Sequence, residues 1–375
     1  MTDRDALWAA ILANPDDDLP RLVYADWLDE NGSGLPSPER ESAADRAAAI
    51  RTQIEYARAE PFSPVARIAD ERTQRLVKAH RQEWGGHLRE FTETFEFVRG
   101  FIGHVTIEAA RSAQVLPTVF ETDPIQAIRI LRPAARDVWV SLEPVFEAVE
   151  LRQLTTLELP FADMGATVEF EAMTDSPYLG GLTSLSLSGN PIPPEWLTEF
   201  LIGPDLPALT ALDLSDNPHL GPAVTAGLIQ AGHRHFTRLD LSGIIIRSEE
   251  LKRILGSDAL SGVEELCLRW GGWPNPGPLT LLDLGWVLPW DRLRLLDLDG
   301  HGLGPDGVLE LLRKPATENL RWLGLARNEL GSEGVRLLTA SGLLNLYYLD
   351  VRHNGLGQRD VERLRKRFPE AVIEC

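Results

Sequence analysis

Cysteine is nearly absent from this sequence. Only Cys267 and Cys375 occur among the 375 residues, and they lie far apart, without a Cys-x-x-Cys pair or a Cys/His cluster of zinc spacing. A disulfide framework and a zinc site are therefore not expected. This usage fits a reducing cytoplasm best.

Long apolar runs are missing as well. No window approaches the roughly 18 apolar residues of a membrane-spanning helix. The first residues include Asp3, Arg4 and Asp5, and no uninterrupted apolar segment of a secretory signal follows them. We therefore expect a cytoplasmic protein that neither is secreted nor enters a membrane.

Basic residues are few relative to acidic ones. The chain has 37 Lys and Arg against 56 Asp and Glu, and its formal net charge is −19. Nucleic-acid-binding proteins concentrate Lys and Arg and gain affinity by releasing counterions from the phosphates. The charge therefore disfavours DNA or RNA as a partner and favours a basic protein or peptide.

The usual catalytic motifs G-x-S-x-G, H-E-x-x-H and G-x-x-x-x-G-K-[ST] do not occur. Cys267 would need a His and an acid beside it to act as a nucleophile, and a structural position is the simpler interpretation. We expect neither an enzyme nor a bound cofactor or metal.

What the chain does contain is an internal repeat of the form L-x-x-L-x-L-x-x-N-x-L. The best copies are Leu182, Leu185, Leu187, Asn190, Ile192; Leu320, Leu323, Leu325, Asn328, Leu330; and Leu346, Leu349, Val351, Asn354, Leu356. The first position recurs at Leu154, Leu182, Leu209, Phe236, Val263, Leu293, Leu320 and Leu346, with spacings of 28, 27, 27, 27, 30, 27 and 26. Two weaker units, around Val105 and Ile128, precede these eight copies and read as N-terminal caps.

Each copy predicts a short strand followed by a helix. The L-x-L segment turns its leucines inward, and successive strands pair in parallel about 4.8 Å apart. The residues between strands have helical periodicity, as in Val308, Leu311 and Leu312. The sequence therefore predicts an α/β solenoid of about ten units, with a parallel sheet on the concave face and helices on the convex face.

Four copies lack the asparagine at the ninth position, where Ala162, Ile244, Gly271 and His301 stand instead. That asparagine normally bonds backbone groups in the turn that leaves the strand, so we expect local irregularity at these four turns. The unit from 263 to 292 is also longer than the others and rich in Trp, Gly and Pro. Irregular loops on a regular solenoid often carry function.

This array, over residues 100–375, resembles bacterial leucine-rich repeats of the ribonuclease-inhibitor type. The resemblance implies a horseshoe with a concave parallel sheet. Known members mainly bind proteins, which is an analogy at the level of the fold.

The N-terminal segment predicts three short helices and a fourth over about 65–83. In the second helix, Leu22, Val23 and Trp27 are expected on one face. The string LWAAILANPDDDLPRLVYADWLDENG resembles the repeat-companion domain, a bacterial module that precedes repeat arrays and has no assigned chemistry. We predict this helical domain over 1–62, a linking helix and connection over 63–99, and the solenoid over 100–375.

Strand alternation predicts which side chains face the concave side. The central column comprises Glu158, Ser186, Asp213, Asp240, Cys267, Asp297, Gly324 and Asp350. Its aspartates either attract a cationic partner or serve local hydrogen bonds in water-screened positions.

A second candidate set combines aromatic and cationic side chains, the residue types that dominate interface hot spots. Its members are Trp270, Trp322, Tyr347, Tyr348, Arg269, Arg327, Arg352 and His353. The alternative is that the rings pack on adjacent strands.

The sequence therefore favours a protein-interaction module that binds a protein or peptide on its concave face. The main alternative is a stoichiometric inhibitor or regulator of a basic enzyme, and catalysis is the least favoured reading. A monomer is expected.

Overall fold

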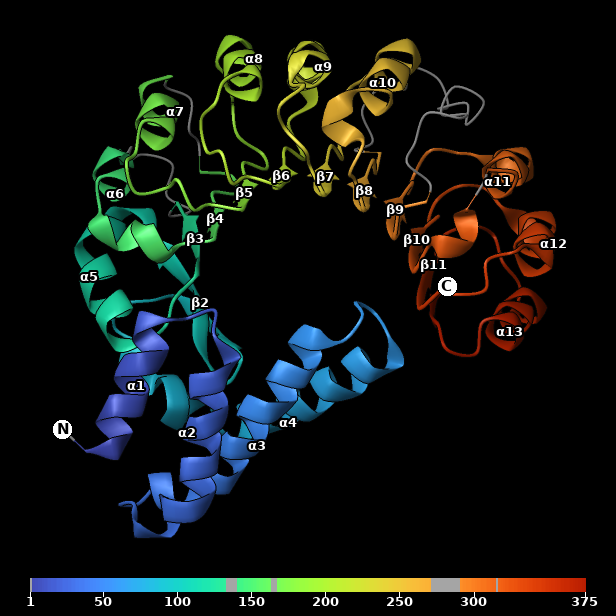
Figure 1. Cartoon of the computed structure of the whole chain (residues 1–375). Coiled ribbons are helices and arrows are strands. Elements are labelled where there is room, and N and C mark those ends of the chain that lie inside the picture. The colour runs from blue at the N-terminus through green and yellow to red at the C-terminus, as the bar shows by residue number, and fades with distance from the viewer. Residues whose placement is uncertain (1, 133–139, 163–166, 271–290, 315) are drawn as a thin grey trace. The chain divides into compact units, whose positions relative to one another are not determined.

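A computed structural model of the chain describes residues 2–132, 140–162, 167–270, 291–314 and 316–375 (Figure 1). Contacts divide the chain into two compact units. Unit 1 comprises Met1–Leu159 and Ser176–Leu182, and unit 2 comprises Pro160–Asp175 and Thr183–Cys375. The predicted boundaries at 62/63 and 99/100 both fall within unit 1.

Unit 1 begins with four helices and continues into a small sheet. Its elements are α1 (Asp3–Ala13), α2 (Asp18–Asn31), α3 (Glu39–Arg58), α4 (Pro64–Gly85), β1 (Thr94–Val98), β2 (Phe101–Glu108), α5 (Ser112–Thr122), β3 (Ala127–Leu131), α6 (Glu143–Phe146) and β4 (Thr156–Glu158). Short 3-10 helices cover Gly32–Gly34, Gly86–Leu88, Ala109–Arg111 and Val149–Gln153. Strand β2 pairs antiparallel with β1 and parallel with β3, which pairs parallel with β4.

Local signals set the ends of the first helices. Thr2 and Asp5 form a reciprocal capping box that begins α1, and the Asp17 side chain accepts the Leu19 N–H at the start of α2. The N-terminal helices are thus confirmed. Their core contains Phe101 of β2 as well as Ile11, Tyr24 and Ile50, so the helices and the first strands share one core.

The predicted apolar face of α2 is confirmed in part: Leu22 and Trp27 pack against the core, half-buried, but Val23 does not. Val23 is 42% exposed, whereas the buried side chains of this helix are Arg21, Tyr24, Ala25 and Leu28. Arg21 is buried because its guanidinium donates to the carbonyls of Pro15 and Arg99, at 2.7 and 3.3 Å. A hydrophobicity pattern cannot reveal a polar side chain that finds its partners in distant backbone.

Unit 2 consists of alternating strands and helices. Its elements are α7 (Thr167–Thr174), β5 (Ser184–Ser186), α8 (Pro194–Ile202), β6 (Ala211–Asp213), α9 (Gly221–Gln230), β7 (Arg238–Asp240), α10 (Ser248–Leu255), β8 (Glu265–Cys267), β9 (Leu295–Asp297), α11 (Gly304–Leu312), β10 (Trp322–Gly324), α12 (Gly331–Ala340), β11 (Tyr348–Asp350), α13 (Gln358–Arg367) and β12 (Val372–Glu374). Short 3-10 helices cover Pro218–Leu220, Asp258–Leu260 and Thr317–Asn319.

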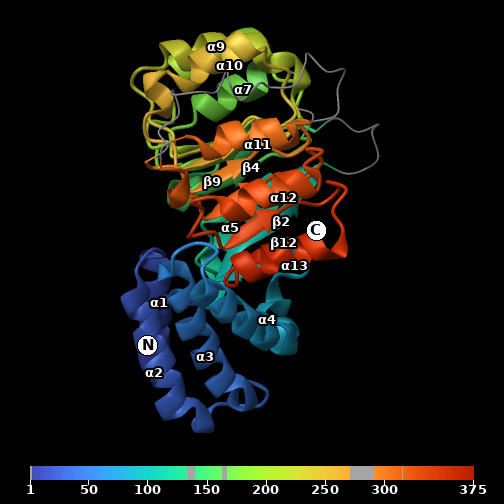
Figure 2. The ribbon, with the colours of Figure 1, turned by 90° about the vertical axis from the view of Figure 1, so that its right-hand side faces the viewer.

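Strands β5 to β12 pair in parallel in chain order, and their central leucines, such as Leu212 and Leu323, are buried. Within this unit, helices α8 to α13 lie on the outer side of the strands (Figure 1). Figure 2 shows α11, α12 and α13 stacked in the order of the chain. The predicted strand-helix repeat is confirmed.

Buried asparagines close the turns that leave the strands. The Asn217 and Asn354 side-chain amides donate to the carbonyls of Leu187 and Leu325 on the preceding unit, at 3.0 and 2.8 Å. Where histidine replaces asparagine, His301 Nε2 lies 2.6 Å from the Leu268 carbonyl, the corresponding bond. The expected irregularity at His301 is therefore wrong, because imidazole supplies the same N–H donor. Gly271 lies outside the described residues.

No helix among the described residues is both long enough and apolar enough to cross a membrane.

Candidate functional site

The concave column of unit 2 has the register that alternation predicts. Ser186, Asp213, Asp240, Cys267, Asp297, Gly324 and Asp350 are paired in sequence across β5 to β11, and Glu374 follows on β12. Glu158, the first predicted member, lies in unit 1 and pairs with Arg129.

The aspartates of this column make local hydrogen bonds. In all four, Oδ1 accepts the N–H two residues further along: Asp213 from Ser215, Asp240 from Ser242, Asp297 from Asp299 and Asp350 from Arg352. Two of the carboxylates, Asp297 and Asp350, are only 2% exposed. Part of their role is therefore to hold the turn after the strand.

Two arginines neutralise the buried pair. Arg269 Nε lies 3.3 Å from Asp297, and Arg352 contacts both carboxylate oxygens of Asp350. Both arginine side chains are more than half exposed. Neither Asp213 nor Asp240 forms an ion pair with any described residue, so the free negative charge of the column lies toward β6 and β7.

A third acid, Asp299, belongs to this cluster and was not predicted. Glycine at 324 makes room for it, since a Cβ there would lie 2.6 Å from Asp297 Oδ1 and 2.9 Å from Asp299 Oδ1. Burial and the charge of Asp297 raise the pKa of Asp299 to about 7. Strand alternation could have found this residue, because it occupies the next position on the concave face after Asp297, beyond the buried Leu298.

Replacing Asp299 by asparagine is expected to raise Tm at pH 8 and to raise it by a smaller amount at pH 5. A carboxyl whose pKa is raised on folding contributes stability that is complete only below its ordinary pKa of 3.8, and this contribution is lost progressively as pH rises to about 7. With allowance for solvent screening, the difference at pH 8 is about 1 kcal/mol, or a few degrees. Thermal unfolding at pH 5, 6, 7 and 8 measures it. A difference in Tm between the parent and Asp299→Asn that does not change with pH would contradict the raised pKa of Asp299.

The predicted aromatic residues lie in three places. Trp322 on β10 and Tyr348 on β11 occupy adjacent strands, and their rings stack with centroids 5.1 Å apart and an interplanar angle of 2°. Trp270 follows β8, and its ring lies 6.4 Å from that of His301. Tyr347 precedes β11, and its ring lies under Arg321. The structure therefore brings Trp322 and Tyr348 together and leaves Tyr347 outside the stack.

The remaining predicted cations, Arg327 and His353, lie in the turns after β10 and β11. Both are exposed and hold left-handed backbone, with φ of 53° and 58°. The corresponding turns of other units hold Gly189, Gly243 and Gly300, and also Phe161 and Asp216, all at positive φ, so left-handed backbone here is a feature of the repeat. A side chain at such a position costs roughly 1–2 kcal/mol.

Cys267 is unsuited to nucleophilic catalysis. It lies in the column between Asp240 and Asp297, and burial together with these two carboxylates raises the pKa of its thiol. The protonated thiol is a poor nucleophile.

The glycines at 302, 304 and 307 have the G-x-G-x-x-G spacing of phosphate-binding turns and lie between β9 and α11. The Gly304 N–H donates to the Asn328 carbonyl and the Leu303 N–H to Asn328 Oδ1. These N–H donors are used in hydrogen bonds to the turn of the next repeat unit, so the glycine spacing here has a structural role.

Parallel L-x-L strands in one register, helices on the opposite side and asparagine-closed turns together decide the architecture. The repeats of unit 2 therefore have the strand, turn and helix pattern of leucine-rich repeats.

No protein-family model matches the chain, and no curated protein matches it. Among solved structures, it is similar to the complex of TLR13 with ssRNA13, at 18% identity and a TM-score of 0.31, over 61% of this chain and 33% of that chain. It is also similar to a leucine-rich-repeat protein of Leptospira interrogans, at 14% identity and a TM-score of 0.20, over 73% of this chain and 90% of that one. The chain thus spans about a third of the TLR13 chain.

Proposed function

We propose that the leucine-rich repeats of unit 2 bind a protein or peptide on the concave face of β9 to β11. The observation that carries the proposal is the stack of Trp322 and Tyr348, whose rings are partly exposed at strand positions that alternate with the buried Leu323 and Leu349. Large rigid rings contribute binding energy at a low cost in side-chain entropy, and Trp and Tyr are enriched among hot spots.

The cations beside the stack support the same surface. Arg352 is anchored by Asp350 next to Tyr348, and Arg327 and His353 hold left-handed turns where glycine would cost less. Together these groups provide an aromatic centre with a polar rim, the usual anatomy of a protein interface.

The test uses the full-length chain as bait for a phage-displayed random peptide library. Affinities of selected peptides are then measured by fluorescence polarisation for the parent and for the Trp322→Ala/Tyr348→Ala variant. Hot-spot residues contribute about 2 kcal/mol or more each, so we expect affinity to fall at least 30-fold. Tyr56→Ala is the matched control, because Tyr56 is also an exposed aromatic residue, on α3.

Peptides that bind the double variant as tightly as the parent would contradict the proposed surface. A single-stranded RNA oligonucleotide serves as competitor. If the RNA displaced the bound peptides at lower concentrations than unlabelled peptide does, the proposal of a protein or peptide partner would be wrong. The prediction that the chain has no nucleic-acid partner would then be wrong as well.

A regulator of a basic enzyme is the second candidate. Asp213 and Asp240 support it, because they are half-buried neighbours on β6 and β7 without a described cation partner. Burial and the nearby Asp213 raise the pKa of Asp240, as expected where like charges lie close together. Binding there would weaken steeply with ionic strength, whereas binding on the aromatic stack would change little.

We propose that the N-terminal helices form a bacterial repeat-companion module, as the resemblance implies, and that the protein works in the cytoplasm. No catalytic step is part of the proposal.

A further inference from the structure

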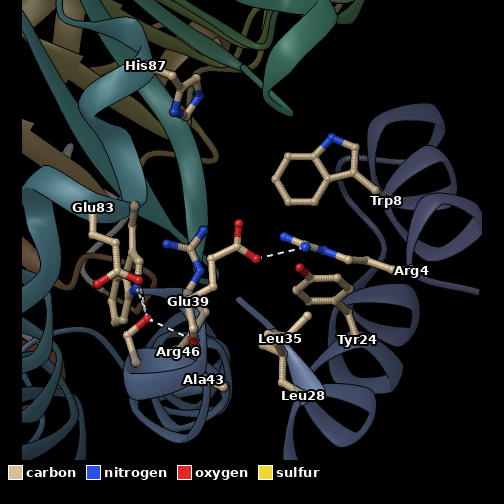
Figure 3. Close-up of a pocket in the computed structure, with 12 residues that line it drawn as sticks. Arg4, Trp8, Tyr24, Leu28, Leu35, Glu39, Ala43, Arg46, Glu83 and His87 are labelled. Carbon is tan, nitrogen blue, oxygen red and sulfur yellow. Dashed lines mark hydrogen bonds and ion pairs between the residues drawn. The ribbon is translucent and has the colours of Figure 1, made fainter. Parts of the chain in front are cut away.

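Unit 1 contains a cavity of about 210 Å³ between its first four helices. Trp8 of α1 and Tyr24 of α2 line one side, Glu83 of α4 lies on the other, and Arg46 of α3 lies between them (Figure 3). Trp84 of α4 also lines the cavity. The cavity lies within unit 1, whereas the proposed binding surface lies within unit 2.

Arg46 is the unusual member of this lining. It is 9% exposed, and its guanidinium lies 4.7 Å from the Trp84 ring centre and 5.2 and 5.3 Å from those of Phe97 and Phe101. It makes no hydrogen bond or ion pair with any described residue, and Nη1 is a buried donor without a partner. Burial lowers the pKa of Arg46 to about 10, so the group stays charged at neutral pH.

The acids around Arg46 are bonded to other groups. Glu39 pairs with Arg4 at 2.7 Å, and Asp123 lies 2.6 Å from His87 Nε2. Glu83 accepts the Ser42 hydroxyl and lies 3.5 Å from His80. None of these carboxylates therefore makes a direct hydrogen bond or ion pair with Arg46, and the charges of Asp123 and Glu83 act on it only from a distance.

Two other described arginines are buried, and both differ from Arg46 in this respect. Arg21 donates to the carbonyls of Pro15, Val98 and Arg99. Arg234 donates to four carbonyls in unit 2. A buried guanidinium is normally satisfied in this way, because an unpaired charge away from water is costly. The donors of Arg46 instead border an open cavity.

We propose that this cavity binds a small carboxylate on a flat apolar body, with the carboxylate on the Arg46 guanidinium and the body between Trp8, Tyr24 and Trp84. A planar guanidinium matches a carboxylate with two parallel hydrogen bonds. The cavity equals the volume of roughly seven water molecules, which suits a ligand the size of benzoate. Glu39 and Glu83 in the lining disfavour a doubly charged phosphate.

The test titrates 4-fluorobenzoate into the full-length protein and follows binding by fluorine NMR. We expect saturable binding to the parent and at least tenfold weaker binding to Arg46→Met, which removes the charge at similar volume. Arg40→Met is the matched control, because Arg40 is exposed on the same helix and does not line the cavity. It should bind as the parent does.

Thermal unfolding without ligand provides a second readout. Because methionine replaces a buried charge that has no hydrogen-bond partner by apolar volume, Arg46→Met should raise Tm, the opposite of what a structural arginine predicts. Arg46→Lys, which keeps the charge and loses the planar fork, should fold and bind several-fold more weakly. If Arg46→Met does not fold, the affinity of Arg46→Lys for 4-fluorobenzoate tests the proposal in its place.

Absence of saturable binding to the parent at millimolar probe would overturn the proposal, as would equal binding by the parent and either Arg46 variant. Tighter binding of phenyl phosphate than of 4-fluorobenzoate would overturn the carboxylate assignment.

Discussion

Replacing Arg234 by methionine should lower the free energy of unfolding by about 3–5 kcal/mol, the range found when one member of a buried charged contact is removed. Arg234 is 5% exposed and donates to the carbonyls of Phe200, Leu201, Gly203 and Asp205 at 2.7 to 3.1 Å. Its guanidinium also lies 4.7 Å from the Phe200 ring centre. Methionine fills the space and leaves these carbonyls at the end of α8 without their donor.

Urea unfolding followed by circular dichroism measures the change. Arg238→Met is the control, because Arg238 is exposed and its ion pair with Glu265, at 3.5 Å, is worth about 1 kcal/mol or less. Equal stability of the two variants would show that the contacts of Arg234 to the α8 carbonyls contribute little.

Gly100→Ala should destabilise the protein by about 2–5 kcal/mol, since it combines left-handed strain with overpacking. Gly100 has φ of +87°, and a Cβ there would lie 2.2 Å from Ile50 Cγ1 and 2.7 Å from the Ile50 backbone. Because Ile50 belongs to the core that α1 to α3 share with β2, the clash pushes the hairpin away from the helices.

Differential scanning calorimetry compares this variant with Gly34→Ala. Gly34 has no heavy atom within 4 Å of an added Cβ, and its φ is not positive, so its substitution should change Tm by less than about 2 °C. A Gly100→Ala protein that unfolds at the parent temperature would mean that β1 and β2 move away from α3 at little cost.

The same turn shows why one element of unit 1 escaped prediction. Arg99 and Gly100 both have positive φ and join β1 to β2 as a two-residue hairpin. Such turns favour Asn-Gly or Asp-Gly, and Arg-Gly does not carry that signal. Strand β1 was therefore assigned to the connection over 63–99, whereas the strands that carry the leucine pattern were found from the sequence.

The two candidate sites also differ in how far the sequence could predict them. Trp322 and Tyr348 were predicted because strand periodicity determines which face a residue occupies, and their stacking follows from the parallel register. The cavity around Arg46 was not predicted. It depends on four helices and two strands meeting around one guanidinium, and no spacing in the sequence records that Glu39, Glu83 and Asp123 are bonded elsewhere.

The turn ladder of the repeats has a consequence for how such a chain can diverge. Asn328 and His301 make the same bond to the preceding unit, although an amide and an imidazole share little apart from a planar N–H donor. Burial lowers the pKa of His301, so its ring stays neutral and keeps one nitrogen as a donor. Each unit retains an N–H donor at the same place in the turn, whereas the residue that supplies this donor can change. Sequence identity between repeats can therefore fall while their geometry is retained.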